Sequence, residues 1–367
     1  MAADCVVSPL GFTTLENYRN LQKGNSGIKL IDDRKLSPET FYGARIEEPF
    51  SDSTLTRFES ISCQAIQQVM HAVAPSGDRT LFILSTTKGN IAFLEEGDPN
   101  NPRIHLHAVA AFLAHKFGFK KHLVVSNACI SGVMALIVGK RMIDTGLYDH
   151  VVVVGADVLS RFVISGFQSL QALSPEACRP FDAARKGINL GECAAAIVLT
   201  TKPEELGINP GVSILGGGLS NDANHISGPS RTGEELVFAI QQAMEEASVS
   251  TRDIDFISAH GTATLYNDEM EAKAFALMGM ERVPMNSLKG YFGHTLGAAG
   301  IVEVVLSAES LMHDELIPSK GFERSGVLQP VNVIQALENR PLKTCLKTAS
   351  GFGGCNAAII LQKENNF

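Results

Sequence analysis

The sequence lacks the features that mark several other classes of protein. Its seven cysteines are scattered along the chain, and no CxxC pair or histidine-spaced cluster occurs among them. Neither a disulfide framework nor a zinc site is therefore expected. No apolar run approaches the roughly 18 residues of a membrane span. The start MAADCVVSPLGF has no basic segment before a long apolar run, so we expect no signal peptide and a reduced, cytoplasmic protein.

An excess of positive charge is also missing. The 31 lysines and arginines are outnumbered by 39 acidic residues, which gives a formal net charge of −8 and an isoelectric point of about 5.7. This charge disfavours binding to nucleic acid, and an acidic partner would need a local basic patch. At 367 residues, 45% of them hydrophobic, the chain exceeds the size at which a single core divides. Its length predicts two domains or two fused halves.

Strands and helices alternate along the chain. Buried-type strands are predicted at 5–10, 80–85, 122–126, 151–154, 194–200, 212–216, 255–258, 344–348 and 357–362, and helices at 14–21, 55–73, 107–117, 234–247, 269–278 and 300–312. Residues 22–54 look like an irregular surface excursion, and the segment after Phe162 looks like a loop. The alternation predicts α/β layers with buried sheets. The polar stretch 201–210, with a proline near each end, predicts a boundary between halves at 1–200 and 201–367.

Cys129 lies between a predicted strand and a predicted helix. The strand 122–126 precedes it, and apolar residues at helical spacing follow it from Ile130 to Val138, before Gly146 marks the helix end. The unpaired N–H groups and the positive dipole end of this helix favour a thiolate, and only the thiolate is a good nucleophile. Most free cysteines are nevertheless buried and inert, so this position alone does not decide the function.

Three further stretches carry residues with chemical potential. His260 opens HGTAT after the apolar strand IDFIS, Lys289 and His294 lie five residues apart in SLKGYFGHTLGAAG, and GFGGCN at 351–356 precedes the last strand. Taken alone, each has a simpler explanation: a structural histidine, a solvated lysine, or glycines that serve backbone geometry. GFGGCN is no dinucleotide-binding fingerprint, because it comes before a strand and not between a strand and a helix.

Together, in this order, these motifs resemble the β-ketoacyl-acyl-carrier-protein (ACP) synthase family of the elongating, type II-like kind. The resemblance covers essentially the whole chain, from VVSPLG at 6–11 through RPFDAARKG at 179–187 to GFGGCNAAI at 351–359. It implies a thiolase-like fold, with two duplicated α/β halves in a five-layer αβαβα arrangement. The half at 1–200 would carry the nucleophile, and the half at 201–367 the two histidines.

The resemblance also implies the reaction, a decarboxylative Claisen condensation. An acyl group would be held on Cys129 as a thioester, and malonyl-ACP would lose CO2 to supply the attacking carbon. His260 and His294 would donate N–H groups to the enolate oxygen, while the backbone N–H groups of Cys129 and Phe352 would form the oxyanion hole. Neither a cofactor nor a metal is implied. The pathway would be fatty-acid synthesis or a specialised lipid or polyketide route, such as that to a polyene.

The remaining site residues are assigned by the same resemblance. Lys289 would pair with Glu271, a glutamate in the motif of His260, and would orient the neighbouring histidine. The residues matched to substrate are Thr262 and Thr264 near the malonyl carboxylate and carrier arm, Phe352 and Gly351 in the turn that gates the acyl pocket, and Asp222 and His225 in a loop near the entrance.

The sequence departs from the family pattern at several places. Cys355 stands where threonine is usual in GFGGCN, Ser350 replaces a common phenylalanine, and Cys193 replaces a glycine. The first two would alter gating and pocket shape, and hence the accepted chain length. The chain is also shorter than the usual elongating synthase, at its N-terminus and before Arg179, which favours a specialised role.

Four alternatives stand beside this family assignment. A CoA-dependent thiolase would share the fold and the nucleophile, but it would carry a Cys-x-Gly setting where Cys355 is followed by Asn and Ala. Chain-initiating synthases have Asn where this chain has His294. A non-catalytic or chain-length-determining subunit of a synthase heterodimer usually lacks the cysteine, and a lipid-binding protein without chemistry would not need this residue set.

The partners follow from the same resemblance. They would be acyl-ACP, malonyl-ACP and a second copy of the chain, or a related subunit in a heterodimer, with no nucleic acid and no membrane. Residues 101–110 would contribute to the subunit contact. Because a carrier protein is acidic, a basic patch is expected, for which the candidates are Arg57, Arg103, Lys120 and Lys121; scattered solubilising charge is the alternative explanation of these four.

Overall fold

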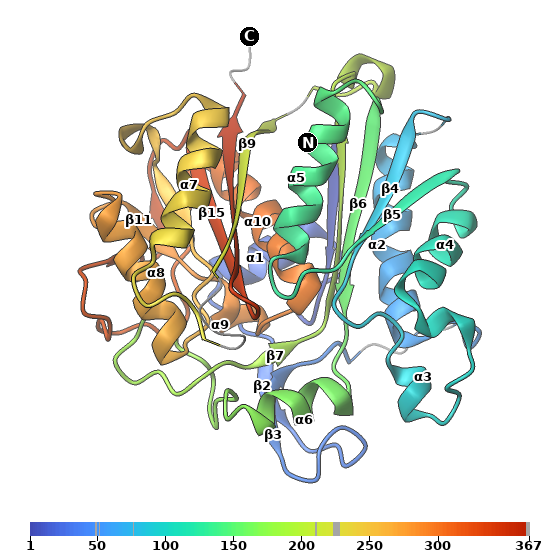
Figure 1. The fold of residues 1–367 in the computed structure, drawn as a ribbon, viewed down its shortest axis with the longest axis horizontal. Coiled ribbons are helices and arrows are strands. Elements are labelled where there is room, and N and C mark those ends of the chain that lie inside the picture. Colours follow the sequence, from blue (N-terminus) through green and yellow to red (C-terminus); the bar gives the residue numbers. More distant parts are fainter. Residues whose placement is uncertain (48–49, 51, 76, 210, 223–227, 365–367) are drawn as a thin grey trace.

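Two sheets form the body of the protein in the computed structural model, which describes residues 1–47, 50, 52–75, 77–209, 211–222 and 228–364 (Figure 1). In sheet order, the first consists of β1 (Ala3–Val7), β8 (Cys193–Thr200), β6 (His150–Asp157), β4 (Thr80–Ser85) and β5 (Lys121–Val125). The second consists of β13 (Asn332–Val333), β11 (Pro284–Asn286), β10 (Phe256–Ser258), β15 (Thr344–Gly351), β16 (Cys355–Lys363) and β9 (Val212–Asn221).

The two sheets repeat one topology. Read as β5-β4-β6-β8-β1 and as β11-β10-β15-β16-β9, both have two parallel pairings followed by two antiparallel ones. Each place is filled by the strand of the same rank along its part of the chain, and β13 adds an edge strand to the second sheet. The fold therefore contains the expected duplication, although α-helices of each part contact the other sheet and the division at residue 200 stays a prediction.

Helices separate the two sheets and cover their outer faces. The middle layer contains α5 (Ser131–Asp144) and α10 (Ala299–His313), and each of them contacts both sheets. On the outer side of the first sheet lie α2 (Arg57–Val73) and α4 (Leu106–Lys116). On the outer side of the second lie α7 (Glu234–Ala247) and α8 (Leu265–Leu277) (Figure 1). This is the five-layer αβαβα arrangement expected from the sequence.

Shorter elements complete the structure. They are the helices α1 (Thr14–Gln22), α3 (Ala92–Glu95), α6 (Arg161–Ser169) and α9 (Lys289–Phe292), the 3-10 turns Pro102–Ile104, Pro203–Leu206, Thr251–Asp253 and Leu296–Ala298, a small sheet of β2 (Ile28–Ile31), β3 (Phe41–Ala44) and β7 (Leu190–Gly191), and the pair β12 (Glu315–Leu316) and β14 (Glu338–Asn339).

Glycines allow the two central helices to approach closely. A Cβ atom added at Gly132 of α5 would lie 2.9 Å from the backbone nitrogen of Ile301, and one added at Gly300 of α10 would lie 2.6 Å from that of Val133. Any larger residue would separate the helices. Since Cys129 precedes α5 and His294 precedes α10, this contact sets the distance between them.

Two predictions of irregular structure were wrong. Residues 22–54 contain β2 and β3, and β3 pairs with the distant β7 through Gly43 and Ala44. The segment after Phe162 is helical as α6, because the Ser160 side chain caps it by accepting from the backbone N–H of Val163. Both errors arise where non-local pairing or a cap outweighs a weak periodic signal. The other predicted elements agree with the structure within about five residues, and β4 and α7 agree to the residue.

Two other findings concern solubility and redox state. Leu296–His313 is the stretch of the described chain that has the length and hydropathy of a membrane span, but 83% of it is buried, as in the core helix of a globular protein. All seven cysteines are buried and free.

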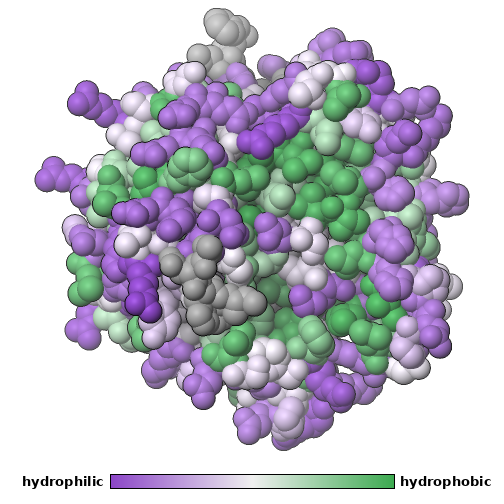
Figure 2. Space-filling model, in the orientation of Figure 1, coloured by the Kyte–Doolittle hydropathy of each residue, from purple (hydrophilic) through white to green (hydrophobic). Residues whose placement is uncertain are grey.

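Apolar side chains gather on one face of the molecule, over α5 and β5 (Figure 2). The partly exposed apolar residues of these two elements are Leu123, Val124, Met134, Val138 and Met142. β5 is also the last strand of its sheet, so one of its backbone edges pairs with β4 and the other faces outwards. We call this surface the α5–β5 face.

Candidate active site

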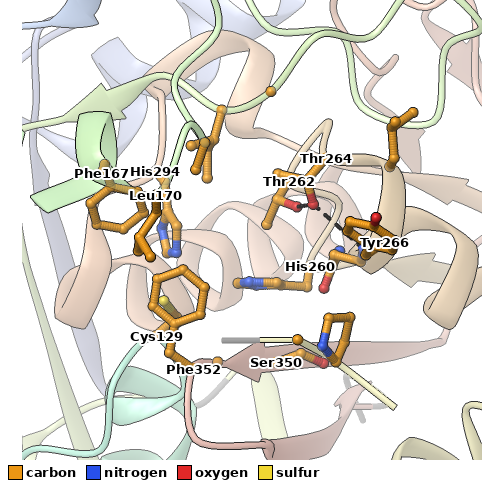
Figure 3. Close-up of a pocket in the computed structure, with 18 of the residues that line it drawn as sticks. Cys129, Phe167, Leu170, His260, Thr262, Thr264, Tyr266, His294, Ser350 and Phe352 are labelled. Carbon is orange, nitrogen blue, oxygen red and sulfur yellow. Dashed lines mark hydrogen bonds between the residues drawn. The ribbon is translucent and has the colours of Figure 1, made fainter. Parts of the chain in front are cut away.

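A cavity of about 520 Å³ brings together the residues singled out in the sequence (Figure 3). Its walls come from both parts of the chain and include Cys129, His260, His294, Thr262, Thr264 and Phe352. The imidazole of His260 extends toward Cys129 and His294 (Figure 3). Cys129 and His294, which are more than 160 positions apart in the sequence, thus line the same cavity.

Cys129 sits in a tight turn between β5 and α5. Ala128, just before it, has a φ of +45°, a left-handed conformation that side chains rarely adopt and that is often found at functional sites. The turn is held by Ser131, whose hydroxyl accepts from the backbone N–H of Asn127 at 2.7 Å and donates to the carbonyl of Ala128 at 2.6 Å. The sulfur is thereby presented at the N-terminal end of α5.

His260 lies directly after β10, at the carboxyl end of that strand. Its backbone N–H donates to Glu271 Oε1 at 2.8 Å, and the N–H of Gly261 donates to Oε2 at 2.7 Å. Thr348 also donates its hydroxyl to Glu271 at 2.9 Å. Glu271 therefore fixes the backbone on which the His260 ring is mounted.

His294 is held by backbone contacts with the small sheet around β7. Its N–H donates to the carbonyl of Asn189 at 2.7 Å, and its carbonyl accepts from Gly191 at 3.0 Å. Its Nδ1 accepts from the backbone N–H of Leu296 at 3.2 Å. Its Nε2 is buried and has no hydrogen-bond partner among the described residues, so this atom is available to a molecule in the cavity.

Hydrogen bonding fixes the tautomer of both imidazoles. His294 Nδ1 accepts a backbone hydrogen, and His260 Nδ1 lies 3.3 Å from Nζ of Lys289, which as an ammonium can only donate. In each ring the proton must then be on Nε2, which faces the cavity. The Cys129 sulfur and one nitrogen of each ring lie within 4.8 Å of one another, and the ring centroids are 5.2 Å apart. These are N–H donors, whereas a metal would need the lone pair of each Nε2.

The partner of Lys289 differs from the one expected. Its Nζ contacts the Glu303 carboxylate at 2.6 Å and the carbonyl of His260 at 2.5 Å, whereas Glu271 bonds the backbone of His260 and Gly261. The prediction of a Lys289–Glu271 pair was therefore wrong. Glu303 approaches from α10, and it is the one acidic residue in the buried run IVEVVL, a signal that the sequence offered.

Lys347 is a second residue that sequence reasoning missed. It lies on β15, its side chain is fully buried, and its Nζ is 2.7 Å from Glu303 Oε2. Glu303 thus lies between two ammonium groups. A lysine inside the apolar strand TCLKTAS is the signal that could have found it, because lysine is almost never fully buried unless it is paired.

Burial makes Cys129 a neutral thiol in the resting protein. Desolvation, with a smaller contribution from the nearby Cys355, raises the pKa of Cys129 to about 12. The positive charge of Lys289 and a backbone hydrogen bond from Phe352 act in the opposite direction. The helix end was expected to favour the thiolate by itself. The structure corrects this expectation, because desolvation raises the pKa of Cys129 more than the helix end lowers it.

Both histidines are neutral as well. Desolvation, followed by the charge of Lys289, lowers the pKa of His260 and of His294 well below the usual range, and Lys347 contributes to both shifts. The site therefore offers uncharged N–H donors over the whole physiological range of pH.

The residues assigned to substrate binding line the mouth of the cavity, with two exceptions. Thr262 and Thr264 share a hydrogen bond of 2.8 Å, and Phe352, 39% exposed, packs on Phe167 with ring centroids 5.7 Å apart. A Cβ at Gly351 would lie 3.0 Å from the backbone nitrogen of Cys129. The two exceptions are Asp222 and His225. Asp222 lies behind this turn, where its backbone N–H donates to the carbonyl of Gly354 at 2.7 Å. His225 lies outside the described residues.

The candidates for a basic patch are mostly engaged within the protein. Arg57 pairs with the buried Glu192 at 2.6 Å, and Arg103 pairs with the buried Glu59 at 2.9 Å. Lys120 pairs with the exposed Asp78 at 2.5 Å. The two arginines therefore act as counter-ions of buried carboxylates, and a carrier-binding patch that includes them stays a prediction.

Comparison with known proteins identifies relatives. Residues 95–205 match the beta-ketoacyl synthase N-terminal domain, and residues 212–323 match the C-terminal domain. The chain is 35% identical over 277 residues to 3-oxoacyl-[acyl-carrier-protein] synthase 2 of Rhizobium meliloti, covering 71% of this chain and 65% of that protein. It is 32% identical over 312 residues to the Vibrio cholerae protein of the same name, covering 78% and 74%.

A solved structure extends the likeness to the whole chain. The ketosynthase ApeO of Xenorhabdus doucetiae, solved in complex with its chain length factor ApeC, has a TM-score of 0.87 at 29% identity and covers 99% of this chain and 97% of its own. The matched region spans just under two thirds of the Rhizobium meliloti relative.

Proposed function

Because the chain belongs to the β-ketoacyl synthase family, we propose that it is a β-ketoacyl-ACP synthase. It joins an acyl group held on Cys129 to malonyl-ACP by decarboxylative Claisen condensation. The observation that carries this proposal is the meeting of one thiol and one ring nitrogen of each of two neutral imidazoles within 4.8 Å in a buried cavity. An acyltransferase that makes an enolate needs this combination of a nucleophile and uncharged donors.

In the first half-reaction the sulfur of Cys129 attacks the thioester carbonyl of acyl-ACP and loses its thiol proton. The new C–S bond forms, the bond to the carrier sulfur breaks, the carrier sulfur leaves and takes up the proton, and the acyl group remains on Cys129. The developing oxyanion receives hydrogen bonds from the backbone N–H groups of Cys129 and Phe352. The close approach of Gly351 to the Cys129 nitrogen supports this assignment, and losing one such donor costs about 2.7–4 kcal/mol of barrier.

In the second half-reaction malonyl-ACP loses CO2. The electron pair of the broken C–C bond forms an enolate, whose oxygen accepts hydrogen bonds from Nε2 of His260 and His294. The enolate carbon attacks the Cys129 thioester, and Cys129 leaves as a thiolate while β-ketoacyl-ACP departs. Because both imidazoles are uncharged, they stabilise the enolate without protonating its carbon.

Lys289 acts through His260 and not on the substrate. Its ammonium donates to Nδ1 of that ring at 3.3 Å and keeps the proton on Nε2. Glu303 holds Lys289 in place at 2.6 Å. Both are positioning residues in this proposal, and Glu271 positions the backbone of His260. Thr262 and Thr264 at the mouth of the cavity are assigned to the malonyl and carrier thioester arm.

A second subunit is part of the proposal. The α5–β5 face is apolar and ends in an open strand edge, so a second copy of the chain can pair with it along β5 and cover Met134 and Val138. A related chain-length subunit is the alternative occupant, as in the complex of ApeO with ApeC. Residues 101–110 stay a predicted contribution to the contact. The acyl and malonyl donors are carrier proteins, and the reaction takes place in the reduced cytoplasm, in keeping with seven free cysteines.

The proposal is tested by measuring intact mass after incubation with acyl-ACP of several chain lengths, followed by malonyl-ACP. Wild type should gain one acyl group and then release a β-ketoacyl product, and the best-loaded chain indicates the pathway. Cys129→Ala should gain none. Cys63→Ala is the matched control, since Cys63 is 8% exposed and Cys129 9%, and it should load normally.

Other outcomes separate the alternatives. Loading of Cys129 from acyl-CoA but not from acyl-ACP would favour a thiolase. No loading from either donor would favour the non-catalytic partner subunit of a synthase heterodimer.

A further inference from the structure

Lys347 has an environment that a structural lysine rarely has. Its side chain is 0% exposed in the middle of the second sheet, between β10 and β16. The ammonium donates to three backbone carbonyls, those of Ser258 at 3.1 Å, Ala259 at 3.3 Å and Thr348 at 2.6 Å. Burying this charge opposes folding, so a function for it is worth seeking.

Two of these carbonyls belong to the segment that presents His260. Ser258 ends β10, Ala259 follows it, and His260 is the next residue. Lys347 is paired in register with Ser258 across the two parallel strands. The ammonium therefore links the end of β10 to β15 in addition to the backbone hydrogen bonds between these strands. This link lies directly before His260 in the chain.

The same ammonium also determines the position of Glu303. Lys347 Nζ lies 2.7 Å from Oε2, and Lys289 Nζ lies 2.6 Å from Oε1 of the same carboxylate. The two lysines thus hold Glu303 from both sides, and Lys289 in turn contacts Nδ1 of His260. A shift of Lys347 would therefore also move Glu303 and Lys289, and with them the contact of Lys289 with the His260 ring.

We propose that Lys347 is a positioning residue of the condensation site, which holds Glu303 and the strand end before His260 and adds a buried positive charge behind both histidines. The inference rests on the proposed synthase function. Desolvation lowers the pKa of Lys347, and the Glu303 carboxylate opposes that shift. With Lys347 as an ammonium, the cluster of Lys289, Glu303 and Lys347 has a net charge of +1, whereas Lys289 and Glu303 alone would be neutral. The extra charge favours the enolate at Nε2 and opposes protonation of either imidazole.

Several other charged or titratable groups lie near these histidines and are common to every variant considered below. They are Glu271 from α8, whose carboxylate bonds the His260 backbone at 2.8 Å, Cys129 before α5, and Asp157, which ends β6 and accepts from the backbone N–H of Gly297 at 2.7 Å.

Lys347→Met tests the proposal, because it removes the charge at similar side-chain length. Without the charge the pKa of both histidines rises, so the acid limb of the condensation pH profile should move upward by about half to one pH unit. An imidazolium can protonate the enolate, so a larger share of malonyl-ACP should end as acetyl-ACP. The kcat should fall about tenfold, less than the roughly 10²–10³-fold loss of a donor that touches an oxyanion. Loading of Cys129 should change little.

Two further variants distinguish charge from packing. Lys347→Arg keeps the charge and should leave the acid limb at the wild-type position. Lys140→Met is the matched control, since Lys140 also pairs with two carboxylates, Asp144 at 2.6 Å and Glu246 at 2.7 Å, but lies at the far end of α5. It should change stability and leave the profile and the acetyl-ACP share unaltered. If Lys347→Met does not fold, Lys347→Gln, which retains a donor, replaces it under the same criterion.

An unmoved acid limb with an unchanged product ratio in Lys347→Met would overturn this inference and leave the synthase proposal intact, and so would an equal shift in Lys347→Arg or Lys140→Met. A wild type that neither loads Cys129 nor releases a β-ketoacyl product would overturn both.

Discussion

At the scale of single residues, two opposing effects act on Cys129. The helix end, the nearby ammonium of Lys289 and the backbone of Phe352 favour the thiolate, while removal from water favours the thiol. Desolvation prevails and raises the pKa of Cys129 to about 12. In the proposed reaction Cys129 therefore stays a thiol until a thioester binds.

This balance makes a prediction about alkylation. Below a pKa of about 12 the thiolate fraction rises tenfold for each pH unit, so modification of Cys129 by iodoacetamide should accelerate about tenfold per unit between about pH 6 and about pH 9. Peptide mass analysis, with the Cys129→Ala protein as background, measures the rate. A plateau inside this range would mean that the helix end and the imidazole donors outweigh desolvation.

Glu303 is the second residue whose environment yields a prediction. Glu303→Gln leaves the two buried ammoniums of Lys289 and Lys347 without their shared carboxylate, which should lower the free energy of unfolding by about 3–5 kcal/mol. Condensation should also slow, because Lys289 would no longer be held beside His260. Denaturant unfolding and steady-state rates provide the measurements.

Glu271→Gln is the comparison for that experiment. It leaves the Lys289–Glu303 contact intact and keeps one oxygen to accept backbone hydrogens near His260, so its loss of stability should be the smaller. A larger loss in Glu271→Gln than in Glu303→Gln would contradict the assignment of Glu303 as the partner of Lys289.

At the scale of elements, the contact of α5 with α10 positions the chemistry. Cys129 lies just before the first of these helices and the loop of His294 leads into the second, so the separation of the helices sets the distance between the two residues. Backbone atoms meet at Gly132, where a Cβ would lie 2.9 Å from Ile301 N and 3.0 Å from Gly297 O. Backbone cannot move aside as a side chain can.

Gly132→Ala should therefore destabilise the protein by about 1–3 kcal/mol and slow condensation by moving Cys129 away from His294. Gly166→Ala in α6 is the control, because a Cβ there meets nothing within 4 Å, and it should be neutral or stabilising by up to about 1 kcal/mol. Thermal unfolding and kcat report both effects. Equal behaviour of the two variants would contradict the role given to the helix contact.

At the scale of the whole molecule, the two sheets repeat one topology and enclose α5 and α10 between them. The site lies where the two repeats meet, and neither repeat contains all of its residues. The α5–β5 face extends from the nucleophile's helix to the outside, so a subunit bound there would lie next to the cavity.

Leu123→Glu on β5 should convert an assembly of twice the 39.3 kDa chain mass into single chains, because a charge would be buried against the second subunit. Leu30→Glu, at an exposed leucine of the small β2 sheet, should leave the assembly unchanged. Light scattering after gel filtration measures the mass. A wild type that is already a single chain, or a Leu123→Glu variant of unchanged mass, would be evidence against this interface.

The sequence by itself singled out Cys129 and the two histidines that meet in the cavity, and it determined the layered α/β fold and most of its elements. The elements are local properties: buried strands such as β6 read as continuous apolar runs, and residue type and spacing are enough to identify them. The roles expected of Cys129, His260 and His294 rest instead on the order of their motifs along the whole chain.

Only the tertiary structure decided which groups face one another. It gave Lys289 the carboxylate of Glu303 in place of Glu271, added Lys347 to the same cluster, and made Arg57 and Arg103 internal counter-ions. It also showed that desolvation outweighs the expected effect of the helix end on the pKa of Cys129. Ion-pair partners and pKa values depend on distance and burial, and both are set by the packing of segments that lie far apart in the chain.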